Sequence, residues 1–288
     1  MVKDTQQDNN KKPEIIQTVA ELRAFVSAKR LQRRRIAMVP TMGALHDGHM
    51  ELVRVGRGLA DDVIASIFVN PAQFGPNEDF AAYPRTWDAD LAKLAEEGAA
   101  AVFYPAVAEM YPDGFSTNIT LKGVTAPLEG AARPGHFDGV ATVVCKLLLQ
   151  CMPDVALFGE KDWQQLQVIT RMVVDLNIPV AVRGVPTVRD ENGLALSSRN
   201  AYLSAEQYQV AITLNKTMSA MAARVRAGED IAAVEAWGAA EVLRAGFDSV
   251  DYLTVRDAAT LEAPGAGAMR ILAAVRLGRA RLIDNIAV

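Results

Sequence analysis

The sequence has few of the residues that mark a secreted or membrane-spanning protein. Its two cysteines, Cys145 and Cys151, lack Cys-x-x-Cys spacing and lie in an apolar segment, so we expect buried free thiols in a reducing compartment. No apolar run reaches the roughly 18 residues that a membrane span needs. The polar stretch 1–13 contains no apolar core, which predicts a disordered tail and not a signal peptide. We therefore expect a soluble, cytoplasmic protein.

Other absences limit the chemistry. The net charge is −4, so the chain has no overall attraction for nucleic acid or for an anionic membrane. Neither Gly-x-Gly-x-x-Gly nor Gly-x-x-x-x-Gly-Lys-Ser/Thr occurs, which disfavours a dinucleotide oxidoreductase and a P-loop NTPase. Only three histidines are present, and His46 and His49 are two of them.

Apolar runs alternate with helical patterns over the first two thirds of the chain. We expect strands at 36–39, 62–69, 101–104, 118–121, 154–158 and 180–185, and helices at 18–34, from 47, at 87–97, at 140–150 and at 163–176. This alternation predicts an α/β fold with a doubly wound, parallel, Rossmann-like sheet over residues 14–186. The pattern then changes. Helices at 204–226 and 231–245, followed by strands at 251–255, 271–275 and 281–286 with a hairpin turn at Gly278, predict a smaller α+β domain over 187–288.

The first candidate site is the turn between the strand at 36–39 and the helix that begins near Asp47. His46 and His49 are one helical turn apart, so their rings are expected on the same side of the chain. The free N–H groups at a helix start favour an anion, and two imidazoles beside them add donors. The turn therefore suits a phosphate group, although a surface turn with two incidental histidines would have the same sequence.

Other loops carry polar side chains at positions where α/β proteins bind ligands. Asn70 and Gln73 follow the strand at 62–69, and Lys161 lies between a strand and a helix start. The loop 128–139 holds the third histidine. It is interpreted as a substrate lid, as a metal-facing loop or as a plain connection.

The segment 197–199 offers two hydroxyls and a guanidinium, which are good phosphate donors. Each loop also has a plainer interpretation, as a Pro/Gly turn, a solvated helix start or a helix cap. Together, however, the loops contain all three histidines, and they follow strands or join the two halves of the chain. That pattern predicts a nucleotide bound across the carboxyl edge of the sheet, with the second domain closing over it.

Several motifs resemble those of one family. The segment 46–49 resembles the HIGH-type signature of the adenylate-forming nucleotidyltransferase superfamily, and 196–199 resembles its KMSKS-type loop. Six further segments, in the same order along the chain, resemble motifs of the pantothenate synthetase (pantoate–β-alanine ligase) family. They are residues 40–46, 68–74, 83–86, 133–140, 158–165 and 194–200, and the resemblance as a whole covers about residues 14–288. Trp163 stands where that family often has tyrosine.

The resemblance implies a reaction and its partners. The family joins (R)-pantoate to β-alanine through a pantoyl adenylate, and ATP is converted to AMP and diphosphate. Mg²⁺ is expected on the phosphates, because this ion prefers phosphate and water oxygens. The family also suggests a homodimer, whose contact could come from an apolar strand after Gly123 or from the second domain.

The resemblance further assigns roles to residues. His49 is the general acid for the departing pyrophosphate, with His46 as a second phosphate donor, and Lys161 bridges phosphate charge. Gln73 and Gln165 bind pantoate, and Gln73 also contacts β-alanine. Asn70 and Met42 complete the substrate-binding set. The catalytic set is His46, His49, Lys161, Ser197, Ser198 and Arg199. The implied ATP contacts are Pro40, Thr41, Met42, Gly43, Ala44, Leu45, His46, Asp47, Gly48, His49, Gly159, Glu160, Lys161, Asp162, Val188, Leu196, Ser197, Ser198 and Arg199.

Two alternative functions remain open. Another HIGH-type nucleotidyltransferase of cofactor biosynthesis would share the histidine turn, but it would not need Gln73 and Gln165 to bind a carboxylate. A nucleotide-binding regulator without turnover would not need the full set of charged donors. A zinc hydrolase is disfavoured because His-x-x-His lacks the glutamate of the His-Glu-x-x-His motif and an obvious third ligand.

Overall fold

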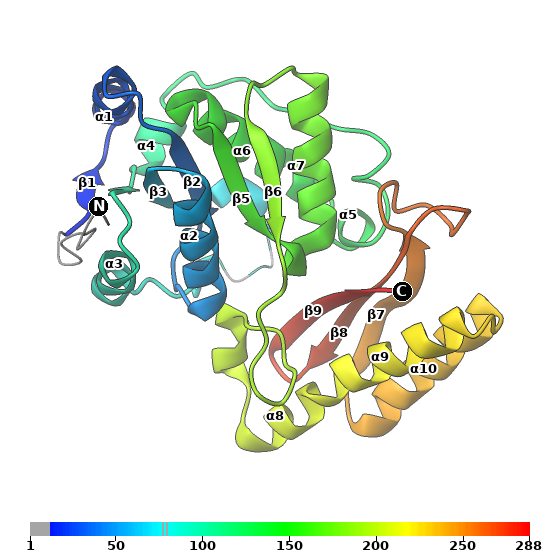
Figure 1. Cartoon of the computed structure of the whole chain (residues 1–288). Coiled ribbons are helices and arrows are strands. Elements are labelled where there is room, and N and C mark those ends of the chain that lie inside the picture. The colour runs from blue at the N-terminus through cyan, green and yellow to red at the C-terminus, as the bar shows by residue number, and fades with distance from the viewer. Residues whose placement is uncertain (1–11, 77, 79) are drawn as a thin grey trace, which may run out of the picture.

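The computed structural model describes residues 12–76, 78 and 80–288, and these form two sheets with their helices (Figure 1). Most of the tail predicted over 1–13 lies outside the described residues. Within the described part of the chain, no helix combines the length and the apolar character needed to span a bilayer.

The larger sheet has six parallel strands in the order β1-β4-β3-β2-β5-β6. The strands are β1 Glu14–Ile16, β2 Ile36–Thr41, β3 Asp62–Ile67, β4 Ala101–Phe103, β5 Val155–Gly159 and β6 Ala181–Val185. Strand β2 is central: β3, β4 and β1 lie in turn on one side of it, and β5 and β6 lie on the other. The carboxyl ends of β2 and β5 therefore flank the switch point at which open α/β sheets bind ligands.

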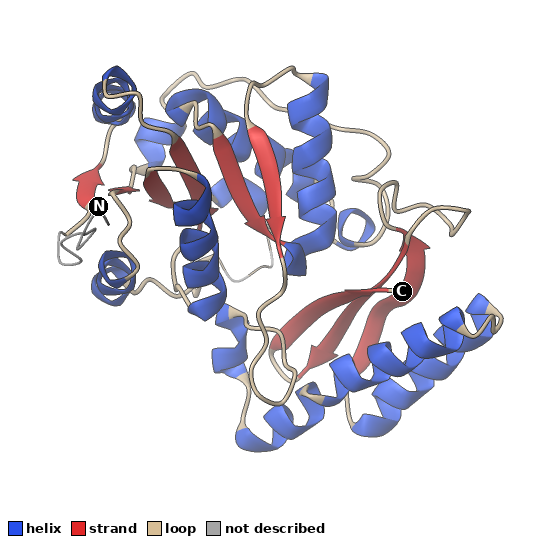
Figure 2. Cartoon of the chain, viewed as in Figure 1, coloured by secondary structure: helices blue, strands red, loops and turns tan. Residues whose placement is uncertain are grey.

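Helices cover both faces of this sheet (Figure 2). They are α1 Val19–Leu31, α2 Asp47–Leu59, α3 Trp87–Glu96, α4 Val107–Met110, α5 Glu129–Ala132, α6 His136–Cys151 and α7 Trp163–Asp175. Along β2, Ile36 and Met38 pack in the core that contains α6, whereas Ala37 and Val39 pack in the core that contains α2. Because both faces are covered there, the inner strands β2 and β5 are nearly continuous apolar runs, whereas the edge strands β1 and β6 are largely exposed.

The smaller sheet is antiparallel, in the order β7-β8-β9. Its elements are α8 Ala205–Ala211, α9 Thr213–Arg226, α10 Ile231–Ala245, β7 Ser249–Asp257, β8 Met269–Leu277 and β9 Ala280–Ala287. Helices α9 and α10 cover one face, and Gly238 lets them approach, since a side chain there would collide with the sulfur of Met221. On the other face, Leu272 packs with Leu128 of the larger unit, so the two units share a small apolar cluster.

The predicted fold class is confirmed. Thr18 and Glu21 form a capping box at the start of α1, and a helix begins at Asp47, as predicted. Cys145 and Cys151 are buried free thiols, as predicted. The domain boundary at residue 186 stays a prediction.

Two predicted strands are wrong, although all of residues 118–128 are described. Residues 118–121 form no strand, because the Ile119 N–H donates to Thr142 Oγ1 on α6 (2.9 Å) and not to another strand. The segment after Gly123 forms turns, so no apolar strand lies there to supply a dimer contact.

Three helical predictions also need correction. Part of the loop 128–139 is the short helix α5, and α6 begins at His136, before the predicted start at 140. The single helix predicted over 204–226 is divided at Ile212 into α8 and α9. Beside that break, the Thr213 hydroxyl donates to the Val210 carbonyl (2.6 Å), a local bond that competes with regular helix geometry.

Candidate active site

The loop between β2 and α2 is held in place by a buried acid on α3. Asp90 accepts hydrogen bonds from the N–H groups of Ala44 (2.9 Å) and Leu45 (2.8 Å), and the residue is 1% exposed. Gly43 has φ 86°, and a side chain there would crowd Asp90 Oδ2 at 3.2 Å. The loop is therefore fixed before it reaches the first histidine.

His46 and His49 have defined tautomers. His46 Nδ1 accepts from the Gly48 N–H (3.2 Å), and His49 Nδ1 accepts from the His46 N–H (3.3 Å). The ring centroids are 4.1 Å apart. Because both Nδ1 atoms accept, the hydrogen of each neutral ring is on Nε2. The turn therefore presents two neutral N–H donors that suit an anion.

The electrostatics of the turn keep both rings uncharged. Burial, reinforced by the charge of Lys161, lowers the pKa of His46 to about 4. Burial also lowers the pKa of His49 to about 3, with further contributions from His46 and Lys161. In the absence of a ligand, both rings therefore act as neutral donors at neutral pH, and neither is a charged acid.

Lys161 lies in the loop between β5 and α7. Residues Glu160–Asp162 form a 3-10 turn, and Trp163 Nε1 at the start of α7 donates to the Ala258 carbonyl of the second domain (2.7 Å). Within the described residues, the Lys161 ammonium forms no hydrogen bond or ion pair with a protein acceptor. Its charge is therefore available to a bound anion.

The loop that follows β6 reaches the histidine turn from the second domain. A side chain on Gly48 would lie 3.9 Å from Leu196 Cβ, so the loop and the start of α2 are neighbours. Ser197 caps the 3-10 helix Ser198–Tyr202 by accepting from the Arg199 N–H (3.3 Å). The structure thus brings three of the predicted loops to one place.

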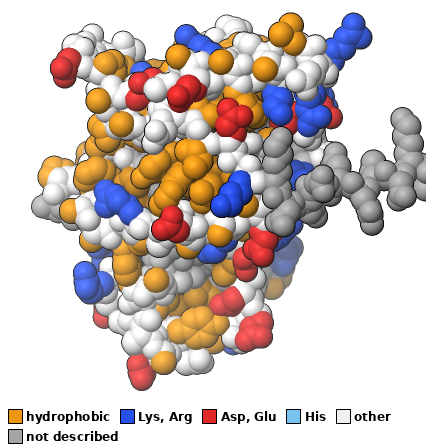
Figure 3. Space-filling view, turned by 90° about the vertical axis from the view of Figure 1, so that its left-hand side faces the viewer, with side chains coloured by type: hydrophobic (Ala, Val, Ile, Leu, Met, Phe, Trp, Pro, Cys, Tyr) orange, Lys and Arg blue, Asp and Glu red, His pale blue; other side chains and the backbone are white. Residues whose placement is uncertain are grey.

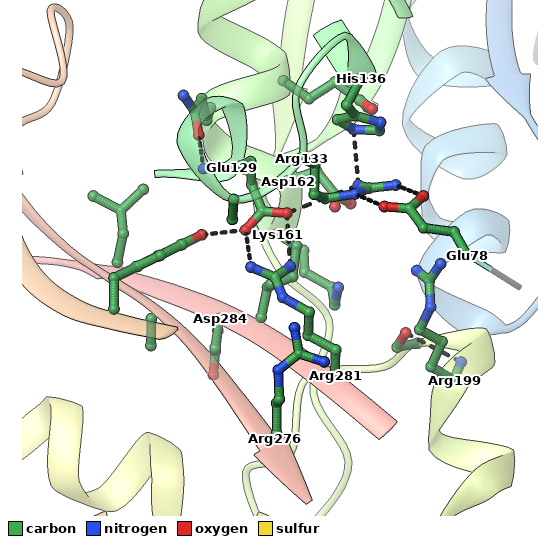
Figure 4. Close-up of a pocket in the computed structure, with 18 of the residues that line it drawn as sticks. Glu78, Glu129, Arg133, His136, Lys161, Asp162, Arg199, Arg276, Arg281 and Asp284 are labelled. Atoms are coloured by element: carbon green, nitrogen blue, oxygen red, sulfur yellow. Dashed lines mark hydrogen bonds and ion pairs between the residues drawn. The ribbon is translucent and has the colours of Figure 1, made fainter. Parts of the chain in front are cut away.

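A cavity of about 720 Å³ lies between the two domains. Lys161 and Asp162 line it from the first domain, and Arg199 and Arg281 line it from the second (Figure 4). Gln165 and Ser197 also line the cavity. His46 and His49 do not line it, although the charge of Lys161 influences both rings.

An ion-pair network around the buried carboxylate of Glu129 forms one wall of the cavity (Figure 4). Both oxygens of Glu129 on α5 accept from the Arg281 guanidinium of β9 (2.7 and 2.7 Å), and the Tyr252 hydroxyl donates to Glu129 Oε1 (2.7 Å). Burial raises the pKa of Glu129, but Arg281, Tyr252 and Arg133 together outweigh burial and hold that pKa below its usual range. Asp251 also pairs with Arg281 (2.6 Å). This network connects the two domains.

The predicted substrate-binding amides have different environments. Gln73 Nε2 lies 2.8 Å from the Met42 sulfur, and Gln73 Oε1 accepts from Asn70 Nδ2 (3.1 Å). All hydrogen-bonding positions of the Asn70 amide are used within the protein, including its contacts with Tyr111 and Gly139. Asn70 therefore holds Gln73, and a direct contact of Asn70 with substrate stays a prediction. Met42 and Gly43 line a second cavity of about 350 Å³.

The third histidine connects two of the predicted loops. His136 Nδ1 donates to the Gln73 carbonyl (2.8 Å), and His136 Nε2 accepts from Arg133 (2.9 Å). Glu78 accepts from the same guanidinium (2.6 Å). Burial, followed by the charge of Arg133, lowers the pKa of His136 to about 4.

Sequence reasoning missed Asp90 and Gln164. Gln164 donates to the carbonyls of Val124 (2.9 Å) and Pro127 (2.7 Å) and accepts from the Glu129 N–H (3.0 Å), so it shapes the segment before α5. A signal for Asp90 was present, because it lies three residues after Trp87 and four before Leu94, on the apolar face of its helix. An acid on such a face needs buried donors.

The three neutral histidines predict lower stability in mild acid. A histidine whose pKa is lowered by folding binds protons more readily in the unfolded chain, so its contribution is complete above about pH 6.5 and is lost as the pH falls toward 4. Each histidine should change the unfolding free energy by up to about 1.4 kcal/mol per pH unit in that window. Urea unfolding across the window measures this. The triple variant His46→Gln, His49→Gln, His136→Gln should have a shallower slope, and an equal slope would contradict the prediction.

Comparisons with known proteins agree over nearly the whole chain. A sequence model of the family described as pantoate-beta-alanine ligase matches residues 14–287. The chain is similar to a pantothenate synthetase from Paramagnetospirillum magneticum, with 57% identity over 277 residues that cover 95% of this chain and 97% of that protein.

Two solved structures extend this similarity to the fold. A pantothenate synthetase from Thermus thermophilus is 48% identical, with a TM-score of 0.88, over 95% of this chain and 98% of that one. A pantoate-beta-alanine ligase from Francisella tularensis, complexed with beta-gamma ATP and beta-alanine, is 33% identical, with a TM-score of 0.81, over 96% of this chain and 97% of that one. The resemblance drawn from the motifs is confirmed: the chain belongs to the pantoate–beta-alanine ligase family.

Proposed function

We propose that this chain catalyses the ATP-dependent condensation of (R)-pantoate with β-alanine, which yields pantothenate, AMP and diphosphate through a pantoyl adenylate. Family membership supports this reaction, and so does the relative whose structure is described as complexed with beta-gamma ATP and beta-alanine. The observation that carries the proposal is the convergence of the histidine turn, the Lys161 loop and the Leu196 loop at the carboxyl edge of the sheet.

The chemistry explains why such donors are needed. A carboxylate is a poor acyl donor, and adenylation gives it AMP as a leaving group. A pantoate carboxylate oxygen attacks the α-phosphorus, and the bond to the bridging oxygen breaks, so that diphosphate leaves with the electron pair. Two anions meet in this step, so preorganised positive charge and N–H donors lower its barrier. The amine of β-alanine then attacks the acyl carbon and displaces AMP.

We assign the phosphate contacts to three groups. Lys161 supplies the positive charge, and His46 and His49 supply neutral Nε2–H donors. Because a bound triphosphate favours the protonated imidazole, ATP binding should raise the pKa of His49. Only then would His49 suit the role of general acid toward diphosphate, so we place ATP binding before proton donation.

For pantoate, we propose contacts with Gln73 and Gln165. Gln165 lines the cavity, and Gln73 lies beside Met42 at the start of the loop between β2 and α2. Asn70 contributes by orienting Gln73. The other residues that the family resemblance implies as ATP contacts, among them Val188 and the segment 159–162, are also proposed to contact ATP.

The segment 197–199 is expected to close over ATP. Closure should protect the peptide bond after Arg199 from trypsin when a non-hydrolysable ATP analogue is bound. Cleavage after Lys122, an exposed residue elsewhere, serves as the internal control. Equal cleavage after Arg199 with and without the nucleotide would contradict closure.

We propose that Mg²⁺ enters with ATP, bound chiefly by phosphate and water oxygens. The described residues contain no group of three or more His, Cys, Asp or Glu side chains that could hold a metal ion, so we assign no protein ligands to it. The two free buried thiols suit the reducing cytoplasm, where we place the protein.

We also propose a homodimer, on the basis of the family. One candidate contact is the face formed by β1, α1, α3 and α4, where hydrophobic side chains gather (Figure 3). Exposed apolar side chains on these elements include Ile15, Leu31 and Val107.

One assay tests the proposed function. The protein is incubated with ATP, pantoate and β-alanine, and the products are identified. AMP and diphosphate together with pantothenate are expected. ADP and phosphate would indicate an acyl-phosphate ligase, a product that retains the nucleotide would indicate another nucleotidyltransferase, and no nucleotide consumption would favour a regulator.

A further inference from the structure

We propose that Asn285, on the last strand of the second domain, is a positioning residue that fixes the main chain on both sides of Lys161. The inference rests on the proposed function, because it concerns how the Lys161 ammonium is held in position for the adenylation step. Asn285 lies 124 residues along the chain from Lys161 and is 3% exposed.

The carrying observation is a pair of hydrogen bonds from one amide. Asn285 Nδ2 donates to the Glu160 carbonyl (2.8 Å) and to the Lys161 carbonyl (2.8 Å). The first carbonyl belongs to the peptide unit that enters Lys161, and the second belongs to the unit that leaves it. Both peptide planes that flank the Lys161 Cα are therefore clamped, which limits the φ and ψ angles of this residue.

Asn285 is itself oriented by its neighbours. Its Oδ1 accepts from the Arg270 guanidinium, and that group stacks on the Trp163 ring, 3.4 Å from the ring centroid. A reversed amide would point its oxygen at two carbonyls and its N–H groups at a cation. The observed orientation is thus the one that the surroundings permit.

The same strand also holds the opposite side of the site. Asp284 accepts two bonds from the Arg189 guanidinium (2.7 and 2.8 Å), and Arg189 leads into the segment that carries Leu196. Two successive residues of β9 therefore bind both the Lys161 loop and the loop that carries Leu196, so that one sheet holds the two loops. Asp284 and Lys161 both line the cavity (Figure 4).

This clamp has a consequence for the reaction. The Lys161 ammonium forms no hydrogen bond or ion pair with any acceptor in the described chain, and four flexible carbons separate it from the backbone. Its position at the α-phosphorus therefore depends on the backbone of residues 160 and 161. Small misplacements of a charged group lower the rate of a step that relies on that group.

The variant Asn285→Asp tests the clamp, because it keeps the shape and the Oδ1 acceptor for Arg270 and replaces only the Nδ2 donor. We expect pantoate-dependent exchange between ATP and diphosphate to fall at least about tenfold. Aminolysis of separately prepared pantoyl adenylate by β-alanine should stay within about twofold of the wild type, since it does not expel diphosphate. Asn177→Asp, which adds the same charge at an exposed turn, should behave as the wild type.

A double-mutant cycle separates positioning from general damage. In a Lys161→Ala background, Asn285→Asp should cause little further loss of exchange, because the group that it positions is already absent. Asn285→Ala, which adds no charge, provides the same comparison if the aspartate variant does not fold. Equal losses in both backgrounds, or exchange by Asn285→Asp equal to the wild type, would overturn the inference. If the wild type itself shows no exchange, the proposed function fails first.

Discussion

Replacing Lys161 with alanine is expected to slow formation of the pantoyl adenylate by roughly a hundredfold or more. Loss of one preorganised donor to a developing negative charge costs about 3 kcal/mol at the transition state. Lys161 has no protein acceptor within the described residues, so its removal leaves no buried partner unsatisfied. The loss should therefore affect catalysis and leave the unfolding free energy nearly unchanged.

Single-turnover release of diphosphate from ATP and pantoate measures this effect. Lys161→Arg, which keeps the charge but changes its geometry, should retain part of the activity. Lys216→Ala removes an exposed lysine on α9 and controls for net charge. Near-wild-type turnover in purified Lys161→Ala would remove this residue from the mechanism.

Replacing Glu129 with alanine is expected to lower the unfolding free energy by about 3 kcal/mol. The change leaves the partly buried Arg281 guanidinium with Asp251 alone, and it also removes the acceptor of the Tyr252 hydroxyl. Breaking a buried ion pair by removing one partner typically costs about 3–5 kcal/mol, and the remaining carboxylate places the expected value at the lower end.

Urea unfolding at neutral pH measures the loss. Glu129→Gln keeps the shape and an acceptor oxygen, so it should be less destabilising than alanine. Asp175→Ala breaks the exposed pair with Arg171 on α7 and should have no measurable effect. If Glu129→Ala and Asp175→Ala had equal effects, the network would not hold the two domains together.

The sequence predicted most of the large sheet well, because strands buried on both faces, such as β2 and β5, are nearly continuous apolar runs. It did not predict β1, which has three residues and depends on pairing with β4. It also predicted a strand at 118–121, where the backbone instead donates to Thr142 on a neighbouring helix. In both cases a tertiary contact, and not the local pattern, decides the conformation.

In the candidate site, too, some features could be predicted from the local sequence and others depend on tertiary contacts. Its loops could be predicted, since histidine, lysine and serine side chains follow strands or join the two domains. Asp90 and Asn285 could not be assigned a role from the sequence, because their partners are main-chain groups that are distant along the chain. Every residue type offers nearly the same backbone N–H and C=O groups, so the sequence does not show which residue such a bond reaches. The neutral state of His46 and His49 likewise follows from burial that only the fold reveals.

The most direct test of this account is a crystal structure of the protein with a non-hydrolysable ATP analogue and pantoate. We expect the triphosphate at the start of α2, within about 3.2 Å of Nε2 of His46 or His49 and of the Lys161 ammonium. A nucleotide bound out of reach of both imidazoles would contradict the convergence of the three loops on one triphosphate.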